Sequence, residues 1–146
     1  MHPGFGVYVH IPFCAKKCDY CAFATFTDRH QLTTNYLAAV RAHIRRSVAD
    51  AMPSATSVFV GGGTPTLVPP RELMSVLAEI PLAPGAEVTI ECNPDDITLE
   101  MMQIFRAGGV NRISIGVQST VDHVLKSLGR THNPENVKRS VSFVRE

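Results

Sequence analysis

Three of the four cysteines in this 146-residue chain stand close together and carry its most distinctive chemistry. Cys14, Cys18 and Cys21 have the spacing C-x3-C-x2-C, so one short loop can direct all three thiolates at a single compact inorganic core. A [4Fe-4S] cluster held by three protein ligands has one iron left open. In an electron-transfer cluster a fourth cysteine normally binds that iron. The missing fourth cysteine therefore indicates that the open iron binds an exchangeable ligand.

Zinc is the alternative metal for this loop. It prefers four tetrahedral ligands, and His10 or Cys92 could supply the fourth. The cysteines occupy one loop and have no second pair of ligands, which favours the cluster. Spacing alone leaves zinc and inert buried thiols open. The spacing of the cysteines also leaves open whether His10 belongs to the site or is a core histidine whose ring nitrogens are hydrogen-bonded. Cys92 is interpreted as a small apolar core residue.

Other unusual residues follow the predicted strands. The run Gly61-Gly62-Gly63-Thr64-Pro65 comes after a β-rich segment, Glu91 ends another, and Gly116-Val117-Gln118 follows a third. The carboxyl ends of parallel strands meet at one edge of a sheet, so we expect a shared site there. Bare glycine backbone can approach a ligand closely, although an ordinary turn is the alternative. A carboxylate at the end of a buried strand, such as Glu91, is costly unless a polar partner satisfies it.

Strands and helices alternate along the chain. Strands are predicted at 6–11, 57–60, 87–91 and 112–116, and helices at 34–49, 70–80, 99–107, 121–128 and from 134 onwards. This order predicts βα units around a parallel sheet, with right-handed crossovers that place the helices on one side of a barrel-like wall. The last helix simply ends at Glu146, so we expect the chain to be part of a larger fold.

Composition excludes some classes of partner and location. The formal net charge of +1 gives no clustered positive charge for nucleic acid. No apolar run approaches the length that spans a membrane, and the N-terminus has no signal-peptide pattern. We therefore expect a cytoplasmic protein, in which thiols stay reduced and clustered cysteines bind metal more often than they form disulfides.

Several spaced motifs occur in the order that is typical of the radical S-adenosylmethionine (SAM) family. The chain resembles this family, and more narrowly oxygen-independent coproporphyrinogen oxidase and its HemW relatives. The resemblance implies an α/β fold, a partial (β/α) barrel of the radical SAM type with about four βα units, truncated at the C-terminus. Residues 1–146 would be the N-terminal part of the core domain. The motifs are Tyr8-Val9-His10-Ile11-Pro12-Phe13-Cys14, Cys18-Asp19-Tyr20-Cys21, Gly-Gly-Gly-Thr-Pro, Gly116-Val117-Gln118 and Leu128-Gly129-Arg130-Thr131-His132.

The resemblance also implies cofactors. A [4Fe-4S] cluster on the three cysteines would bind SAM at its open iron, through the methionyl amino and carboxylate groups. One electron would then cleave SAM to methionine and a 5′-deoxyadenosyl radical. No catalytic residue is assigned, and each implied SAM contact has a structural alternative. The implied SAM contacts are Tyr8, Tyr20, Gly62, Gly63, Thr64, Glu91, Gln118 and Arg130.

One position favours a particular branch of the family. The porphyrinogen-oxidising branch has a further cysteine two residues after the third ligand, where this chain has Phe23. The resemblance therefore favours a HemW-type haem chaperone whose partners are haem, haem-accepting apoproteins and a one-electron donor such as flavodoxin or ferredoxin. The alternatives are a radical enzyme that oxidatively decarboxylates coproporphyrinogen III, and an inactive cluster-binding fragment. No haem ligand is assigned within the chain.

Overall fold

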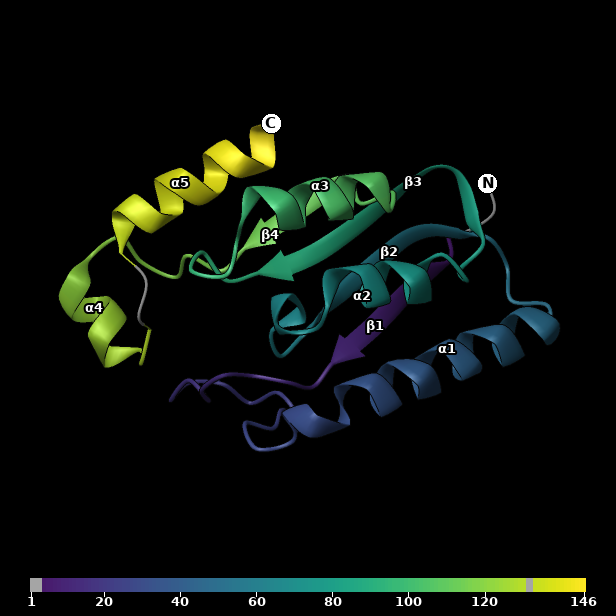
Figure 1. Ribbon diagram of the computed structural model, residues 1–146, viewed down its shortest axis with the longest axis horizontal. Coiled ribbons are helices and arrows are strands. Elements are labelled where there is room, and N and C mark those ends of the chain that lie inside the picture. Colours follow the sequence, from purple (N-terminus) through teal and green to yellow (C-terminus); the bar gives the residue numbers. More distant parts are fainter. Residues whose placement is uncertain (1–3, 131–132) are drawn as a thin grey trace.

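A parallel four-stranded sheet forms the centre of the protein (Figure 1). The computed structural model describes residues 4–130 and 133–146, so the first three residues and the Thr131-His132 end of the last motif lie outside the described part. The strand order is that of the sequence, and each neighbouring pair is parallel. The strands are β1 (Gly6–Ile11), β2 (Ala55–Gly62), β3 (Leu82–Cys92) and β4 (Arg112–Ile115).

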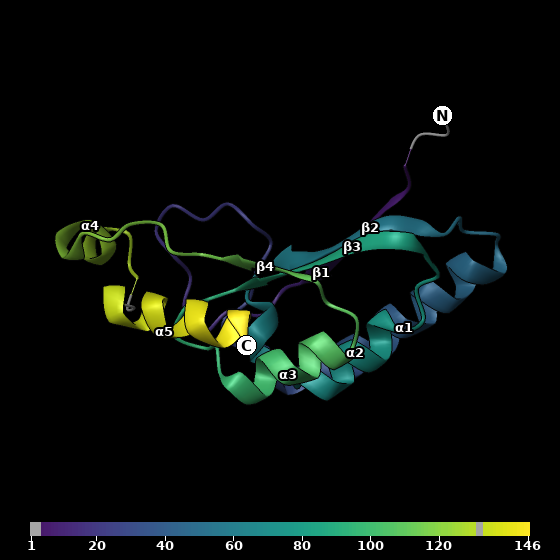
Figure 2. The ribbon, with the colours of Figure 1, turned by 90° about the horizontal axis from the view of Figure 1, so that it is seen from above.

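Helices connect the strands and cover one face of the sheet. Figure 2 shows α1, α2 and α3 on the same side of the strands, as right-handed crossovers require. The predicted α/β architecture of successive βα units is therefore confirmed. The helices are α1 (Thr33–Ala49), α2 (Pro70–Leu77), α3 (Leu99–Ala107), α4 (Asp122–Ser127) and α5 (Pro134–Arg145), with short 3-10 turns η1 (His30–Leu32) and η2 (Pro65–Leu67).

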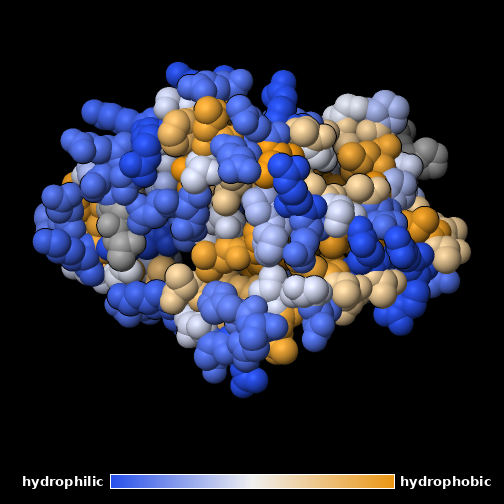
Figure 3. All heavy atoms as spheres, in the orientation of Figure 1, coloured by the Kyte–Doolittle hydropathy of each residue, from blue (hydrophilic) through white to orange (hydrophobic). Residues whose placement is uncertain are grey.

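The core lies between the sheet and these helices. Alternate strand residues such as Ile11, Val60 and Ile90 are fully buried, and they share one apolar cluster with Leu73 of α2 and Phe105 of α3. Since successive strand residues point to opposite faces, the intervening positions lie on the other face of the sheet, where aromatic and polar side chains such as Phe59 and Glu91 both occur. In the space-filling view, hydrophobic groups are interspersed with hydrophilic ones (Figure 3). Among the described residues, no helix is both long and apolar enough to cross a membrane.

Several element boundaries differ from the sequence expectation. The predicted end of the second strand at residue 60 was wrong, because Gly61 and Gly62 continue the ladder opposite His10 and Ile11. The third strand begins at Leu82, which pairs with Ala55 ahead of an irregularity in the register. Helix α2 ends at Leu77, because the backbone N–H groups of residues 79 and 80 switch to tighter bonds that reach back three residues.

Helix starts were predictable from their caps. The Thr98 hydroxyl accepts a hydrogen bond from the Met101 N–H at 3.2 Å, and the Asn133 side chain accepts one from the Asn136 N–H at 2.8 Å. Both residues directly precede the helices predicted at 99–107 and from 134 onwards, and both are of the types that favour the N-cap position. In α5 the three valines at helical spacing, Val137, Val141 and Val144, are only partly covered, and the fully buried residue is Ser140.

Candidate functional site

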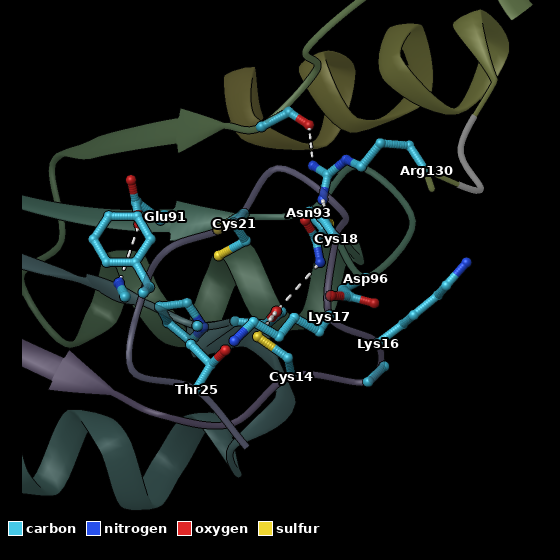
Figure 4. A pocket seen from close by; sticks show the side chains of 18 of the residues that line it. Cys14, Lys16, Lys17, Cys18, Cys21, Thr25, Glu91, Asn93, Asp96 and Arg130 are labelled. Carbon is cyan, nitrogen blue, oxygen red and sulfur yellow. Dashed lines mark hydrogen bonds between the residues drawn. The ribbon is translucent and has the colours of Figure 1, made fainter. Parts of the chain in front are cut away.

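A cavity of about 300 Å³ lies at the carboxyl ends of the strands, a volume within the range of small-molecule sites (Figure 4). Residues that follow all four strands line it, so the expected shared edge is confirmed. All the predicted site residues except Tyr8 line it. They are Cys14, Cys18, Cys21, Tyr20, Gly62, Gly63, Thr64, Glu91, Gln118 and Arg130.

The loop that carries the cysteines leaves β1 and returns alongside it. The Phe26 N–H donates to the Pro12 carbonyl at 2.7 Å, and the Cys14 N–H donates to the Phe26 carbonyl at 3.0 Å. These two bonds close the loop behind the thiols. All three cysteines are free; Cys14 is buried, whereas Cys18 and Cys21 are partly exposed. Two of the thiols therefore sit near solvent and one sits against the core.

The glycine loop after β2 lies directly against the cysteine loop. The Gly63 N–H donates to the Ile11 carbonyl, and the Thr64 N–H donates to the Phe13 carbonyl, both at 2.7 Å. A Cβ on Gly63 would stand 2.5 Å from the Phe13 oxygen and 2.7 Å from the Ile11 oxygen, closer than real Cβ atoms come. Only glycine permits this approach. Gly62 has φ of +106°, a backbone conformation that also favours glycine.

Side chains donate hydrogen bonds to two of the three thiols. The Thr64 hydroxyl lies 3.8 Å from the Cys14 sulfur, and the Asn93 amide donates to the Thr64 hydroxyl at 3.5 Å. The Arg130 guanidinium lies 3.8 Å from the Cys18 sulfur and also donates to the Gly116 carbonyl (Figure 4). Asn93 is not among the predicted site residues, although its position directly after the third strand was a usable signal.

Several polar groups in the cavity wall have spare hydrogen-bonding capacity. The Arg130 Nε and the Thr25 hydroxyl are buried without a partner in the described part of the chain, which is unusual for buried polar atoms. The Glu91 carboxylate accepts the Gly62 N–H at 3.3 Å. Gln118 has φ of +64°, a strained conformation for a residue other than glycine. A polar ligand in the cavity would find donors and an acceptor in place.

Tyr8 and His10 form a separate arrangement on β1. The Tyr8 hydroxyl donates to His10 Nδ1 at 3.0 Å, and His10 Nε2 donates to the Ala24 carbonyl at 2.9 Å. Both ring nitrogens of His10 are hydrogen-bonded, and one of these bonds reaches the loop that carries the cysteines. This supports a structural role for His10 in holding that loop. The Tyr8 ring stacks on Phe59, and burial, with a smaller effect of Glu91, raises the pKa of Tyr8. Tyr20 lines the cavity, and burial is the main cause of its raised pKa.

The residues fit a multi-iron core better than a zinc ion. Cys92 is 3% exposed, and desolvation raises the pKa of its thiol to about 12, so it stays protonated and belongs to the core as predicted. The lone pair of His10 is occupied by Tyr8. Among the described residues, no three His, Cys, Asp or Glu side chains converge as a single metal ion requires. In a four-iron cluster each thiolate binds its own iron, so thiols that face one cavity without converging suit it.

Residues 8–146 match the radical SAM superfamily, and the chain belongs to this family. "Heme chaperone HemW" from Escherichia coli (strain K12) is 37% identical over 147 residues, which cover 97% of this chain and 39% of that protein. Its counterpart in Mycobacterium tuberculosis (strain H37Rv) is 41% identical over 140 residues, covering 89% of this chain and 35% of that one. The mouse "Radical S-adenosyl methionine domain-containing protein 1, mitochondrial" is 38% identical, over 95% of this chain and 33% of that protein.

A solved structure supports the same fold. Coproporphyrinogen III oxidase (HemN) from Escherichia coli, described as a radical SAM enzyme, superimposes with a TM-score of 0.85 at 30% identity, over 97% of this chain and 34% of that one. The predicted radical SAM barrel fold is confirmed. The chain spans between 33% and 39% of the length of these relatives.

The close approach of the two loops predicts a large effect of Gly63→Ala. The added methyl group meets two backbone oxygens that cannot turn aside, so we expect the free energy of unfolding to fall by about 1–3 kcal/mol. Chemical denaturation with circular dichroism measures this. Gly6→Ala is the matched control, because its new methyl group meets only a movable Ser57 hydroxyl at 3.2 Å. Equal stability of the two variants would contradict the proposed contact.

The raised pKa of Cys92 predicts slow alkylation. In apoprotein kept free of oxygen at pH 8, iodoacetamide should modify Cys18 and Cys21 well before Cys92, as peptide mass spectrometry can follow. Because folding raises the thiol pKa from 9.0 to about 12, this group's contribution to stability is present below pH 9 and is lost as the pH rises toward 12. Alkylation of Cys92 at the rate of Cys21 in folded protein would show that its thiol is not buried.

Proposed function

We propose that this chain holds a [4Fe-4S] cluster through Cys14, Cys18 and Cys21, binds SAM beside it, and is the N-terminal part of the core domain of a HemW-type haem chaperone. The observation that carries the proposal is the meeting of these thiols with the glycine loop around one cavity, in a chain of the radical SAM family. The family implies the two cofactors. Haem transfer is the part of the proposal that goes beyond what membership of the family implies.

Each element of the cavity has a role in this proposal. The thiolates bind three irons, and the backbone of the glycine loop presents its amide and carbonyl groups to the amino acid part of SAM. Glu91 accepts hydrogen bonds from ribose hydroxyls, because a carboxylate that accepts the Gly62 N–H at 3.3 Å still has acceptor capacity on both oxygens. Arg130 offers its Nε, which is unpartnered within the described part of the chain, and Gln118 and Tyr20 line the same cavity. The cluster and SAM together supply one-electron chemistry, and the protein orients them and excludes water.

Tyr8 has weaker support than the other proposed SAM contacts. It does not line the cavity, and its hydroxyl is engaged by His10. A contact between Tyr8 and SAM would use the ring or the acceptor capacity of the hydroxyl oxygen, because the hydroxyl proton is donated to His10. This contact stays a prediction.

The haem chaperone is favoured over the oxidase for two reasons. The relatives that are 37% and 41% identical are named haem chaperones. In addition, Phe23 lines the cavity where the oxidising branch has a further cysteine, so a thiol that the oxidase branch has is missing here. The proposed partners are haem, haem-accepting apoproteins and a one-electron donor such as flavodoxin or ferredoxin.

Oxidation of coproporphyrinogen III is the second candidate. The superposition on coproporphyrinogen III oxidase supports it, with 30% identity over 97% of this chain. Since the fold and the cluster loop are shared by both branches, geometry alone does not separate them. A cluster-binding fragment without activity of its own is the third candidate.

Reconstitution tests the cluster. Under oxygen-free conditions with iron and sulfide, we expect about four iron and four labile sulfide per chain and a paramagnetic spectrum of the reduced protein that SAM perturbs. Cys18→Ser should lose most of the iron, since a ligand is removed, whereas Cys92→Ser should keep it. Protein that contains zinc and no labile sulfide would refute the proposal.

Haem titration separates chaperone from oxidase. We expect haem to bind stably, with a shifted Soret band, and to pass to an apoprotein acceptor. Coproporphyrinogen III with SAM and a reductant should keep its propionate side chains, as product analysis by mass spectrometry can check. Formation of vinyl groups that depends on SAM would establish the oxidase instead.

A further inference from the structure

We propose that Thr64 and Arg130 raise the reduction potential of the cluster by donating hydrogen bonds to two of its cysteine ligands. The inference rests on the proposed function, because it requires the cluster. It assigns to these two side chains a role different from the backbone and ligand contacts proposed above. They act through Cys14 and Cys18, so they are positioning and tuning residues rather than catalytic ones.

The direction of the Thr64 hydrogen bond is fixed by its neighbours. Thr64 is 7% exposed and Cys14 is 8% exposed, so water does not compete at this contact. The backbone N–H of Thr64 is tied to the Phe13 carbonyl, which places its side chain beside the next residue, Cys14. The Asn93 amide donates to the hydroxyl oxygen, so the hydroxyl uses its own proton toward the Cys14 sulfur at 3.8 Å.

Arg130 reaches the second ligand from a different part of the fold. It follows α4 and Gly129, which has φ of +70°. One guanidinium nitrogen is anchored on the Gly116 carbonyl, and the other lies 3.8 Å from the Cys18 sulfur. Because the anchor sets the orientation of the planar guanidinium, its second N–H is directed at the sulfur. The two donors therefore arise independently and act on different ligands.

A hydrogen bond to a ligand sulfur stabilises the more negative state of a cluster. Reduction adds one electron, and part of its charge appears on the sulfur atoms, so a donor binds the reduced form more tightly than the oxidised form. Potentials of iron–sulfur clusters respond to such bonds and to solvent exposure. The buried position of Thr64 strengthens its effect, since the local dielectric constant is low. No bond is made or broken, and the electron comes from an added reductant such as dithionite.

A redox titration of the reconstituted protein without SAM tests the role of Thr64. Thr64→Val removes the hydroxyl but keeps the shape, and we expect the equilibrium constant for reduction to fall about tenfold, which is about 59 mV for a one-electron couple. Thr64→Ser should stay close to the unmodified protein. Thr66→Val is the matched control, since Thr66 is also buried but donates to Asp96 at 2.7 Å.

Arg130→Met provides an independent arm, in which the potential should also become more negative. Because the two donors act on different ligands, the shifts should add in the double variant. Unchanged potentials in Thr64→Val and Arg130→Met, with full iron and sulfide content, would overturn the inference and leave the proposed function standing. Unmodified protein that assembles no cluster would overturn the proposed function itself, and this inference with it.

Discussion

The site depends on one close contact between two loops. The glycine loop after β2 is bonded along its backbone to the chain that leads into the cysteines, through Gly63 to Ile11 and Thr64 to Phe13. A side chain at Gly63 would push the loops apart by colliding with both backbone oxygens. Because Thr64 is the residue that follows, the same contact brings its hydroxyl to the Cys14 sulfur. Loop geometry, cavity shape and the surroundings of one thiol thus share a single cause.

The parallel sheet supplies the frame on which this contact is built. Its helix-facing side is apolar and tightly buried, and this side fixes the register of the four strands. Register in turn determines where each strand ends and which side chain appears there. Cys92 and Glu91 illustrate the alternation: the thiol joins the core, and the carboxylate faces the Gly62 amide. A shift by one residue would exchange these environments and dismantle the cavity wall.

Family membership and cavity geometry support the proposed function in different ways. The radical SAM match and the superposition at a TM-score of 0.85 establish the fold. The cavity adds what a family match does not contain, namely hydrogen bonds directed at two thiols and buried donors that have no partner among residues 4–130 and 133–146. The chain covers 39% of the length of the HemW relative from Escherichia coli, and haem transfer is therefore a proposal.

The sequence by itself determined the cysteine loop, the order of strands and helices, and the helix caps at Thr98 and Asn133. These features are local: ligand spacing, hydrophobic periodicity and capping chemistry are written in neighbouring residues. Tertiary structure alone decided the rest. The strand that continues through Gly61 and Gly62 exists because β1 offers it a partner. The contacts of Thr64 with Cys14 and of Arg130 with Cys18 join residues 50 and 112 positions apart, and no local pattern encodes such distances.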